Sequence, residues 1–352
     1  FETLMEVIDF LNDEICPQPF KVDVKKMFSQ DQNYLVDFAD VKGQAEVKRA
    51  MEVAAAGSHN IIMIGLPGSG KTMLAKRLPT ILPPLTLDEA LETTKIHSIA
   101  GILHNSSAII STRPFRSPHH TASDVSLVGG GPNAKPGEIS FSHNGVLFLD
   151  ELTEFKKNVL EVMRQPLEDR VVTISRSKIS VMYPCNFMLV AAMNPTPAGS
   201  QKEASMYSDF DVQKFLSKIS GPILDRIDLH IHVNPVKYQE LSSKAENERS
   251  EKVRERVIKA RDIQTLRFKD RAGIYSNSNM TSKEIKEYCK IDPDCENLMK
   301  TAITKLGLSA RAYDRILKVS RTIADLSGEK NISTAHISEA IQYRSLDRTS
   351  WL

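Results

Sequence analysis

A glycine-rich segment, residues 65–72, has the residue types and spacing to bind the phosphates of a nucleotide. It follows the apolar run 61–64 and reads GLPGSGKT, which matches the pattern G-x-x-x-x-G-K-[ST]. Its glycines allow backbone N–H groups to turn toward phosphate oxygens, and the start of the next helix adds partial positive charge. We expect Lys71 to reach the β- and γ-phosphates and the Thr72 hydroxyl to ligate Mg²⁺. The predicted ATP contacts here are Pro67, Gly68, Ser69, Gly70, Lys71, Thr72 and Met73.

Two adjacent carboxylates follow a second apolar run, residues 146–149. We expect Asp150 to hold Mg²⁺ through water and Glu151 to polarise the water that attacks the γ-phosphate. Acidic residues at strand ends also serve as simple helix caps, so this pair would not be specific by itself. Combined with the phosphate-binding segment, it predicts ATP hydrolysis.

Two more polar residues lie beside later apolar runs. Asn194 ends the run 187–194, where it is placed to orient the attacking water, although Asn-Pro also forms turns. Arg226 precedes the run 229–233. It is either a local ion-pair partner or an arginine that points across a subunit interface at a neighbour's γ-phosphate, where it would raise the rate about 10³–10⁵-fold.

The elements that position these residues are predicted from the apolar runs. Between about residues 40 and 235 these runs alternate with helical patterns, which indicates a parallel sheet buried between helices. Residues 240–268 are charged and predict one long, largely exposed helix. Further helices are expected near 281–307, near 309–328 and from Ser333. The fold class is therefore α/β: a core with an N-terminal helical segment over residues 1–239, then an all-helical domain over residues 240–352.

Composition narrows the function classes. The net charge of +2 does not by itself indicate a nucleic-acid partner. The four cysteines lack C-x-x-C spacing, which argues against a zinc site and a disulfide framework, and a reducing cytoplasm is the simplest location. No apolar run approaches the roughly 18 residues of a membrane helix. The start at Phe1 inside an amphipathic pattern is what we expect of a fragment of a longer protein.

These motifs resemble, in kind and order, those of an AAA+ ATPase with a P-loop αβα core and a helical lid. The stretches RPFRSPHHT, GGGPNAKPGEIS, HNGVLFLDE, VAAMNP and GPILDRIDLH narrow the resemblance to the magnesium-chelatase-like ATPases of the ComM/YifB group, over about residues 35–345. The resemblance implies a homo-hexameric ring with ATP and Mg²⁺ bound between subunits. Within it, Asn194 matches sensor 1 and Arg226 the trans arginine finger. Arg311 matches sensor 2, with Arg315 as the second candidate.

The resemblance also implies an adenine-flanking segment at residues 40–44, with Val41 and Gly43 as ATP contacts; a simple helix N-terminus is the alternative. Two departures stand out. The family commonly has a cysteine-rich stretch beginning C-P-C-G after the sensor asparagine, whereas residues 196–210 contain no cysteine. The family also carries an N-terminal domain that resembles the Lon protease domain; this chain lacks it, and we expect it in the full-length protein.

Residues 169–183 alternate in a way that predicts a β-hairpin around a basic turn. In the resembling ATPases a hairpin at this position projects into the central channel. Arg170, Arg176 and Lys178 would then contact a phosphate backbone without reading sequence. A solvated hairpin tip is the alternative.

The stretch 113–140 is the second candidate for substrate contact. In family terms it is an insertion in the helix before the second acidic-motif strand. Arg113, Arg116, His119 and His120 would add donors to the channel, with Arg116 and His119 facing it. As metal ligands the adjacent histidines are poor candidates, because neighbouring side chains diverge and no third ligand is visible.

The leading hypothesis is a ring motor that couples ATP hydrolysis to translocation on DNA, or to branch migration, during recombination and natural transformation. The alternative is a chaperone-like ATPase that remodels a partner protein, as the motor subunit of magnesium chelatase does. A nucleotide-dependent scaffold fits less well, because Glu151, Asn194 and Arg226 are all present.

Overall fold

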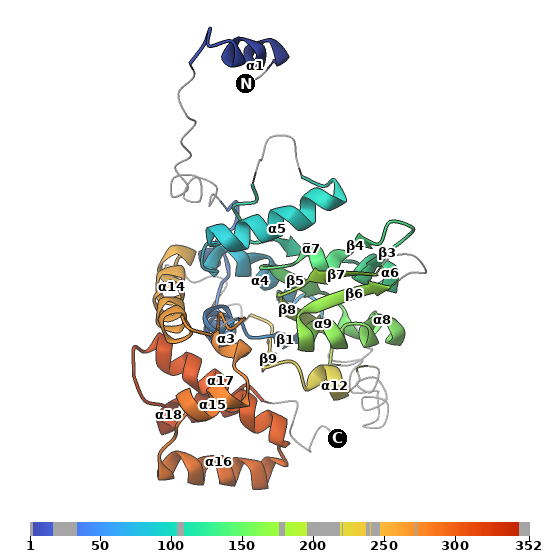
Figure 1. Cartoon of the computed structure of the whole chain (residues 1–352). Helices are drawn as coiled ribbons and strands as arrows, with labels where there is room; N and C mark the ends of the chain where they lie inside the picture. The colour runs from blue at the N-terminus through green and yellow to red at the C-terminus, as the bar shows by residue number, and fades with distance from the viewer. Residues whose placement is uncertain are drawn as a thin grey trace.

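A five-stranded, all-parallel sheet forms the centre of the protein (Figure 1). The computed structural model describes residues 3–16, 34–103, 109–175, 180–195, 219, 221–236, 240, 247–271 and 273–344. The strand order is β2-β5-β8-β1-β9, with each adjacent pair parallel. The strands are β1 (Ile61–Ile64), β2 (Phe115–Arg116), β5 (Val146–Leu149), β8 (Met188–Met193) and β9 (Leu229–His232). The predicted α/β fold with a parallel sheet is confirmed.

Each face of the sheet packs into its own apolar cluster. Along β1, Ile61 and Met63 belong to one cluster, whereas Ile62 and Ile64 belong to the other. This alternation follows from the period of two in a strand, and because both faces are covered every residue of β1 is apolar. The helices and short 3₁₀ turns beside the sheet are α3 (Ala45–Gly57), α4 (Lys71–Arg77), η2 (Leu78–Ile81), α5 (Leu87–Ala100), α6 (Asp124–Val128), α7 (Glu138–Phe141), η3 (Leu152–Glu154), α8 (Lys157–Glu161), α9 (Arg164–Asp169) and α12 (Gly221–Leu224).

The C-terminal helices share a core with α3. Val257 on α14 and Ile323 on α17 lie in the same cluster as the alanines of α3. Figure 1 shows α3 between the sheet and these helices. The helical region comprises α14 (Ser250–Arg267), η4 (Asn277–Asn279), α15 (Ser282–Tyr288), α16 (Pro293–Leu306), α17 (Ala310–Leu326) and α18 (Thr334–Gln342), and near the N-terminus α1 spans Leu4–Leu11. The region is therefore bound directly to the core by apolar packing.

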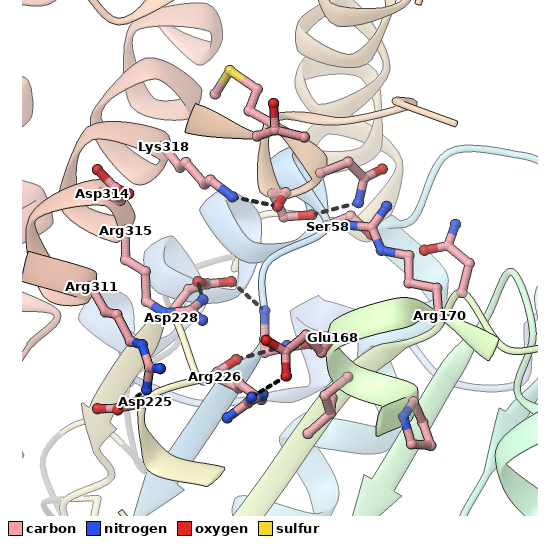
Figure 2. Close-up of a pocket in the computed structure, with 18 of the residues that line it drawn as sticks. Ser58, Glu168, Arg170, Asp225, Arg226, Asp228, Arg311, Asp314, Arg315 and Lys318 are labelled. Carbon is pink, nitrogen blue, oxygen red and sulfur yellow. Dashed lines mark hydrogen bonds and ion pairs between the residues drawn. The ribbon is translucent and has the colours of Figure 1, made fainter. Parts of the chain in front are cut away.

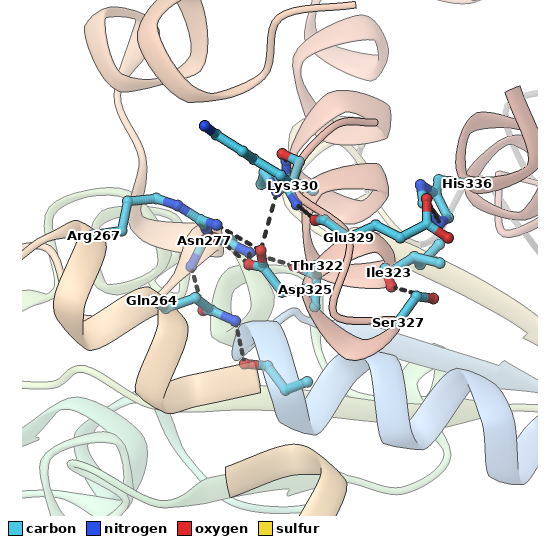
Figure 3. A network of polar contacts seen from close by, with 12 residues as sticks. Gln264, Arg267, Asn277, Thr322, Ile323, Asp325, Ser327, Glu329, Lys330 and His336 are labelled. Atoms are coloured by element: carbon cyan, nitrogen blue, oxygen red, sulfur yellow. Dashed lines mark hydrogen bonds and ion pairs between the residues drawn. The ribbon is translucent and has the colours of Figure 1, made fainter. Parts of the chain in front are cut away.

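A buried polar network adds to this packing (Figure 3). The Asp325 carboxylate on α17 accepts hydrogen bonds from Arg267 at 2.7 Å, from Asn277 at 2.8 Å and from Arg321 at 3.1 Å. Gln264 donates to the carbonyl of Ala56 on α3 at 3.1 Å. Because each buried polar group here has a partner, the network fixes α14, η4 and α17 against α3.

Three sequence expectations change in the structure. The helix expected over 281–307 is two helices, α15 and α16, because Pro293 has no N–H to continue a helix and Asp292 caps α16 by accepting from Cys295 N at 2.8 Å. The long helix α14 forms, but it buries one face, including Val253 and Gln264. The stretch 113–140, expected as an insertion in a helix, also supplies the edge strand β2 through its residues 115–116.

The expected hairpin is confirmed as the antiparallel pair β6 (Val171–Ser175) and β7 (Ser180–Pro184). Its basic turn, with Arg176 and Lys178, lies outside the described residues, and so does the cysteine-free stretch 196–210. A second small antiparallel pair, β3 (Gly129–Gly130) and β4 (Lys135–Pro136), lies within the stretch 113–140. A Cβ on Gly129 would lie 2.4 Å from the carbonyl oxygen of Lys135, so glycine serves close packing here.

Candidate functional site

The phosphate loop joins β1 to α4 at the carboxyl edge of the sheet. Gly68 and Gly70 have φ of +77° and +96°, and a Cβ on Gly68 would meet nothing within 4 Å. Gly65 is required for a different reason: a Cβ at this position would lie only 2.3 Å from the carbonyl oxygen of Val233. The buried Ser69 hydroxyl has no hydrogen-bond partner. An open, glycine-rich loop with an unsatisfied donor fits a ligand that brings oxygen acceptors, such as a triphosphate.

Lys71 lies under this loop with its ammonium already oriented. Its Nζ donates to the carbonyls of Gly65 at 2.7 Å and Leu66 at 3.0 Å, and to Asn194 Oδ1 at 3.2 Å. Burial lowers the pKa of Lys71, while the nearby Asp150 and Glu151 carboxylates oppose that effect. The structure thus brings Lys71 and Asn194 together, as expected from their places at the ends of neighbouring parallel strands.

Thr72 and Asp150, the two residues predicted to hold magnesium, are in direct contact. The Thr72 hydroxyl donates to Asp150 Oδ2 at 2.6 Å, and Asp150 Oδ1 accepts from Glu151 N at 3.0 Å. A hydroxyl and a carboxylate oxygen at this spacing suit Mg²⁺, which takes few protein ligands and completes its shell with phosphate and water. The donor set fits the metal that the sequence predicts.

Glu151 makes a contact that the sequence did not indicate. Its Oε2 lies 3.0 Å from Nδ1 of His120, in the stretch 113–140. The His120 ring also packs on His119, with 4.1 Å between ring centroids. The sequence predicts that both histidines donate to a channel; in the structure, His120 instead contacts the predicted catalytic carboxylate, while His119 is exposed.

The two arginines of the same stretch are engaged within the chain. Arg116 binds Glu138 with two hydrogen bonds, from Nε at 2.6 Å and from Nη2 at 2.7 Å. Arg113 binds Glu89 at 2.9 Å and donates to the carbonyl of Asn144 at 2.7 Å. A channel role for Arg113 is therefore not supported, since its donors are used internally. Arg116 would have to leave Glu138 before it could bind a substrate.

The segment expected beside the adenine lies next to α4. Arg77 of α4 binds Asp40 at 2.9 Å, which attaches this segment to the helix that follows the phosphate loop. Val41 is buried and its carbonyl accepts from Lys48 at 2.6 Å. Gly43 has φ of +59°, and a Cβ there would lie 2.3 Å from the Glu240 carboxylate. The segment is therefore near the loop, and its turn requires glycine.

Arg226 lies at the opposite edge of the sheet from the phosphate loop. Asn60, the residue before β1, donates from Nδ2 to the carbonyl of Arg226 at 2.9 Å. The four residues of β1 span about 13 Å, so the two ends of the strand are far apart. The Arg226 guanidinium binds Glu168 and the carbonyl of Pro222. Arg226 therefore cannot reach a phosphate bound by the loop of its own chain.

Arg311 lies on the same side as Arg226. It binds Asp225 at 3.0 Å, and Arg315, one turn further along α17, binds Asp228. Residues four apart share a face of a helix, so α17 presents both arginines to the segment 225–228. The structure does not bring Arg311 to the phosphate loop of its own chain. The expected ATP contact of this residue is thus not made within one subunit.

These arginines line a polar cavity of about 530 Å³ between the core and α17 (Figure 2). Burial would raise the pKa of Asp228, but Arg315 and His59 outweigh it and hold that pKa well below its ordinary value. Burial lowers the pKa of Arg170, which lines this cavity and not the tip of the hairpin. Besides Arg170, the cationic residues that line the cavity are Arg226, Arg311, Arg315 and Lys318.

Comparison with known proteins identifies the family. Residues 37–241 match the profile of "Magnesium chelatase, subunit ChlI", and residues 247–344 match "Magnesium chelatase, subunit ChlI C-terminal". The chain belongs to the magnesium chelatase ChlI family. This family is of the AAA+ type, which implies ATPase activity and suggests the use of ATP and Mg²⁺.

The relatives of this ChlI-family chain include a competence protein, an uncharacterized protein and a magnesium-chelatase subunit. Competence protein ComM of Haemophilus influenzae is 44% identical over 99% of the chain and 68% of ComM. The uncharacterized protein YifB of Salmonella typhimurium is 43% identical over 89% of the chain and 61% of YifB. The magnesium-chelatase 67 kDa subunit of Heliobacterium mobile is 24% identical over 64% of the chain and 38% of that subunit. The chain thus spans about two thirds of the length of its ComM and YifB relatives.

None of the helices in the described ranges is both long and apolar enough to cross a membrane.

Proposed function

We propose that this protein is the ATPase subunit of a homo-hexameric ring motor in which each ATP site is completed by the next subunit. The observation that carries the proposal is the separation of two sets of residues. Lys71, Thr72 and Asp150 meet at the carboxyl edge of the sheet, whereas Arg226 and Arg311 lie together at the amino edge. One chain cannot bring both sets to one phosphate, but head-to-tail neighbours in a ring can.

The chemistry proposed for the site is hydrolysis of the γ-phosphate. Lys71 and the loop amides bind the phosphates, and Thr72 and Asp150 hold Mg²⁺, which neutralises phosphate charge when bound. Glu151 accepts a proton from the attacking water, and the Asn194 amide orients that water. Arg226 and Arg311 of the neighbour would stabilise the charge that develops on the transferred phosphoryl group.

Before Arg226 and Arg311 can bind a neighbour's phosphate, each must leave the carboxylate that it binds within its own chain. Arg226 is bound to Glu168 and Arg311 to Asp225, so each arginine has an internal carboxylate that a phosphate would replace. Both arginines present donors in the planar fork that suits phosphate oxygens. Glu168 and Asp225 would therefore keep the two arginines neutralised until a neighbouring subunit brings its nucleotide.

DNA is the proposed substrate, with translocation or branch migration in recombination as the work done. Similarity to a protein named for competence supports it, and so does the β6–β7 hairpin, whose turn carries Arg176 and Lys178. His119 and Arg116 are secondary candidates. The second candidate function, remodelling of a partner protein, is favoured by the similarity to a magnesium-chelatase subunit.

The deciding experiment measures ATP hydrolysis with and without single-stranded and forked DNA, beside a branch-migration assay and sedimentation with and without ATP. We expect DNA to stimulate hydrolysis and the double charge reversal R176E/K178E to remove the stimulation without lowering the basal rate. K252E/K259E, a double change at exposed positions on α14, provides the matched charge reversal. Absence of both DNA binding at low salt and stimulation would reject the DNA motor and favour the protein-remodelling alternative.

A further inference from the structure

Asn60, the residue directly before β1, joins the starts of two other strands through its side chain and its backbone. Its Oδ1 accepts from Leu189 N on β8 at 2.8 Å, and its Nδ2 donates to the carbonyl of Arg226 at 2.9 Å. Its own carbonyl accepts from Asp228 N at 2.9 Å and from Leu229 N, the first residue of β9, at 3.0 Å. An amide supplies both a donor and an acceptor, whereas an ionised carboxylate of the same size supplies acceptors alone.

The bond to Arg226 matters because the segment that carries this arginine has little regular structure of its own. The helix before it, α12, has four residues, and Arg226 N donates to the carbonyl of Ile223 at 2.9 Å in the turn that follows. One turn of helix is not stable by itself, because it orders several residues for few hydrogen bonds. Asn60 holds the carbonyl of Arg226 and the amides that open β9, so it fixes the place of the arginine relative to the sheet.

Asn60 also contacts the support of the second arginine proposed to act across the interface. Its backbone N–H donates to Asp228 Oδ2 at 3.0 Å, and the other oxygen of that carboxylate binds Arg315 on α17. Arg315 lies one turn along α17 from Arg311. The residue before β1 therefore connects the backbone of Arg226 to the helix that carries Arg311.

We propose that Asn60 is a positioning residue, which holds the backbone of Arg226 where its guanidinium can reach the nucleotide of a neighbouring subunit. Asn60 does not touch that nucleotide and acts only through Arg226. A displacement of about 1 Å in a group that contacts the reacting atoms can cost about 100-fold in rate, and the planar fork of an arginine also requires the correct orientation. The inference rests on the proposed role of Arg226 in trans and names the residue that sets its geometry.

The first test measures steady-state ATP hydrolysis by N60D. This change keeps the size of the side chain and the acceptor for Leu189 N, but it places a carboxylate against the carbonyl of Arg226. We expect kcat to fall about 100-fold, with KM for ATP little changed because the phosphate loop is intact. N144D is the matched control. Asn144 lies just before β5 at the same edge of the sheet, and its Nδ2 donates to the carbonyl of Glu89 at 3.3 Å.

Thermal midpoints of both variants show how much stability each change removes. We expect N144D to hydrolyse ATP at the wild-type rate, whatever its midpoint. A wild-type kcat in N60D would overturn the inference. An equal loss of kcat in N60D and N144D would do so as well, because it would assign the effect to general destabilisation of this edge.

Mixed rings show which half of the site N60D damages. An N60D subunit keeps Glu151, so a neighbour carrying E151Q, whose Arg226 is correctly held, should restore hydrolysis. N60D mixed with R226A should stay slow, because neither subunit supplies a placed arginine. Recovery in the second mixture, or none in the first while R226A and E151Q complement each other, would reject positioning by Asn60. If R226A and E151Q themselves fail to complement, the proposed role of Arg226 in trans is wrong, so the two failures are distinguishable.

Discussion

Asn60 donates a hydrogen bond from Nδ2 to the carbonyl oxygen of Arg226 at 2.9 Å, and this bond fixes the arginine at the amino edge of the sheet. Asn60 directly precedes strand β1, whereas Lys71 lies beyond the other end of β1, at the carboxyl edge of the sheet. The ends of a protomer are therefore chemically different: one carries a phosphate loop and the other carries Arg226 and Arg311. This polarity is what a ring of identical subunits needs to form composite sites.

Composite sites predict a specific pattern of complementation. R226A and E151Q should each lose hydrolysis, R226A by about 10³–10⁵-fold. In a mixed ring, an R226A subunit still has an intact Glu151, and an E151Q subunit still has an intact Arg226. Where the two are neighbours in the right order, one complete site forms between them. We expect the mixture to recover a measurable part of the wild-type ATPase rate. Mixed rings that form by sedimentation but stay inactive would show that Arg226 does not act across the interface.

Binding measurements should distinguish the role of Lys71, which binds phosphate, from the role of Thr72, which holds Mg²⁺. K71A removes the ammonium that faces the loop, and we expect it to abolish binding of a fluorescent ATP analogue. T72A removes only the hydroxyl bonded to Asp150, so binding without magnesium should persist while the added affinity that Mg²⁺ provides falls. Titrations with Mg²⁺ and with EDTA check this. Equal loss in both conditions for T72A would contradict a metal-holding role.

The sequence predicted the parts of the site that depend on strand ends. Lys71, Asp150 and Asn194 follow neighbouring parallel strands, so their proximity follows from the α/β pattern alone. The contact between His120 and Glu151 depends on how an irregular stretch folds over the sheet edge, which no periodicity encodes. The same holds for Arg311, whose position depends on the packing of α17 against the core.

Two details of the helices were not predicted from apolar spacing: the division of residues 281–307 into α15 and α16, and the buried face of α14. Apolar spacing continues through residues 289–292, and only the capping by Asp292 and the missing N–H of Pro293 divide α15 from α16. The burial of one face of α14 could not be expected from its charged composition. The buried face of α14 has few large apolar side chains, among them Val253 and Val257. These two share an apolar cluster with the alanines of α3, whose small side chains allow the helices to pack closely.

Arg113 should prove to be a stabilising residue and not a DNA contact. Its guanidinium binds Glu89 and the carbonyls of Pro83 and Asn144. R113A leaves the mostly buried Glu89 carboxylate without its cation, and we expect a loss of about 2–4 kcal/mol in the free energy of unfolding. Urea unfolding followed by circular dichroism measures it, with K157A on the exposed face of α8 as control. A stable R113A with weakened DNA binding would reverse this assignment.

Asp228 should make the stability of the protein depend on pH in the acid range. Its folded-state pKa is held well below the ordinary value, because Arg315 and His59 outweigh the effect of burial. A depressed pKa contributes stability that is present above the unfolded-state value, about 3.9, and is lost as pH falls below it. We expect the free energy of unfolding to decline below about pH 4, and D228N to be less stable at pH 7 with a shallower decline. D262N, an exposed change on α14, should keep the wild-type slope; an equally steep slope in D228N would remove Asp228 as its source.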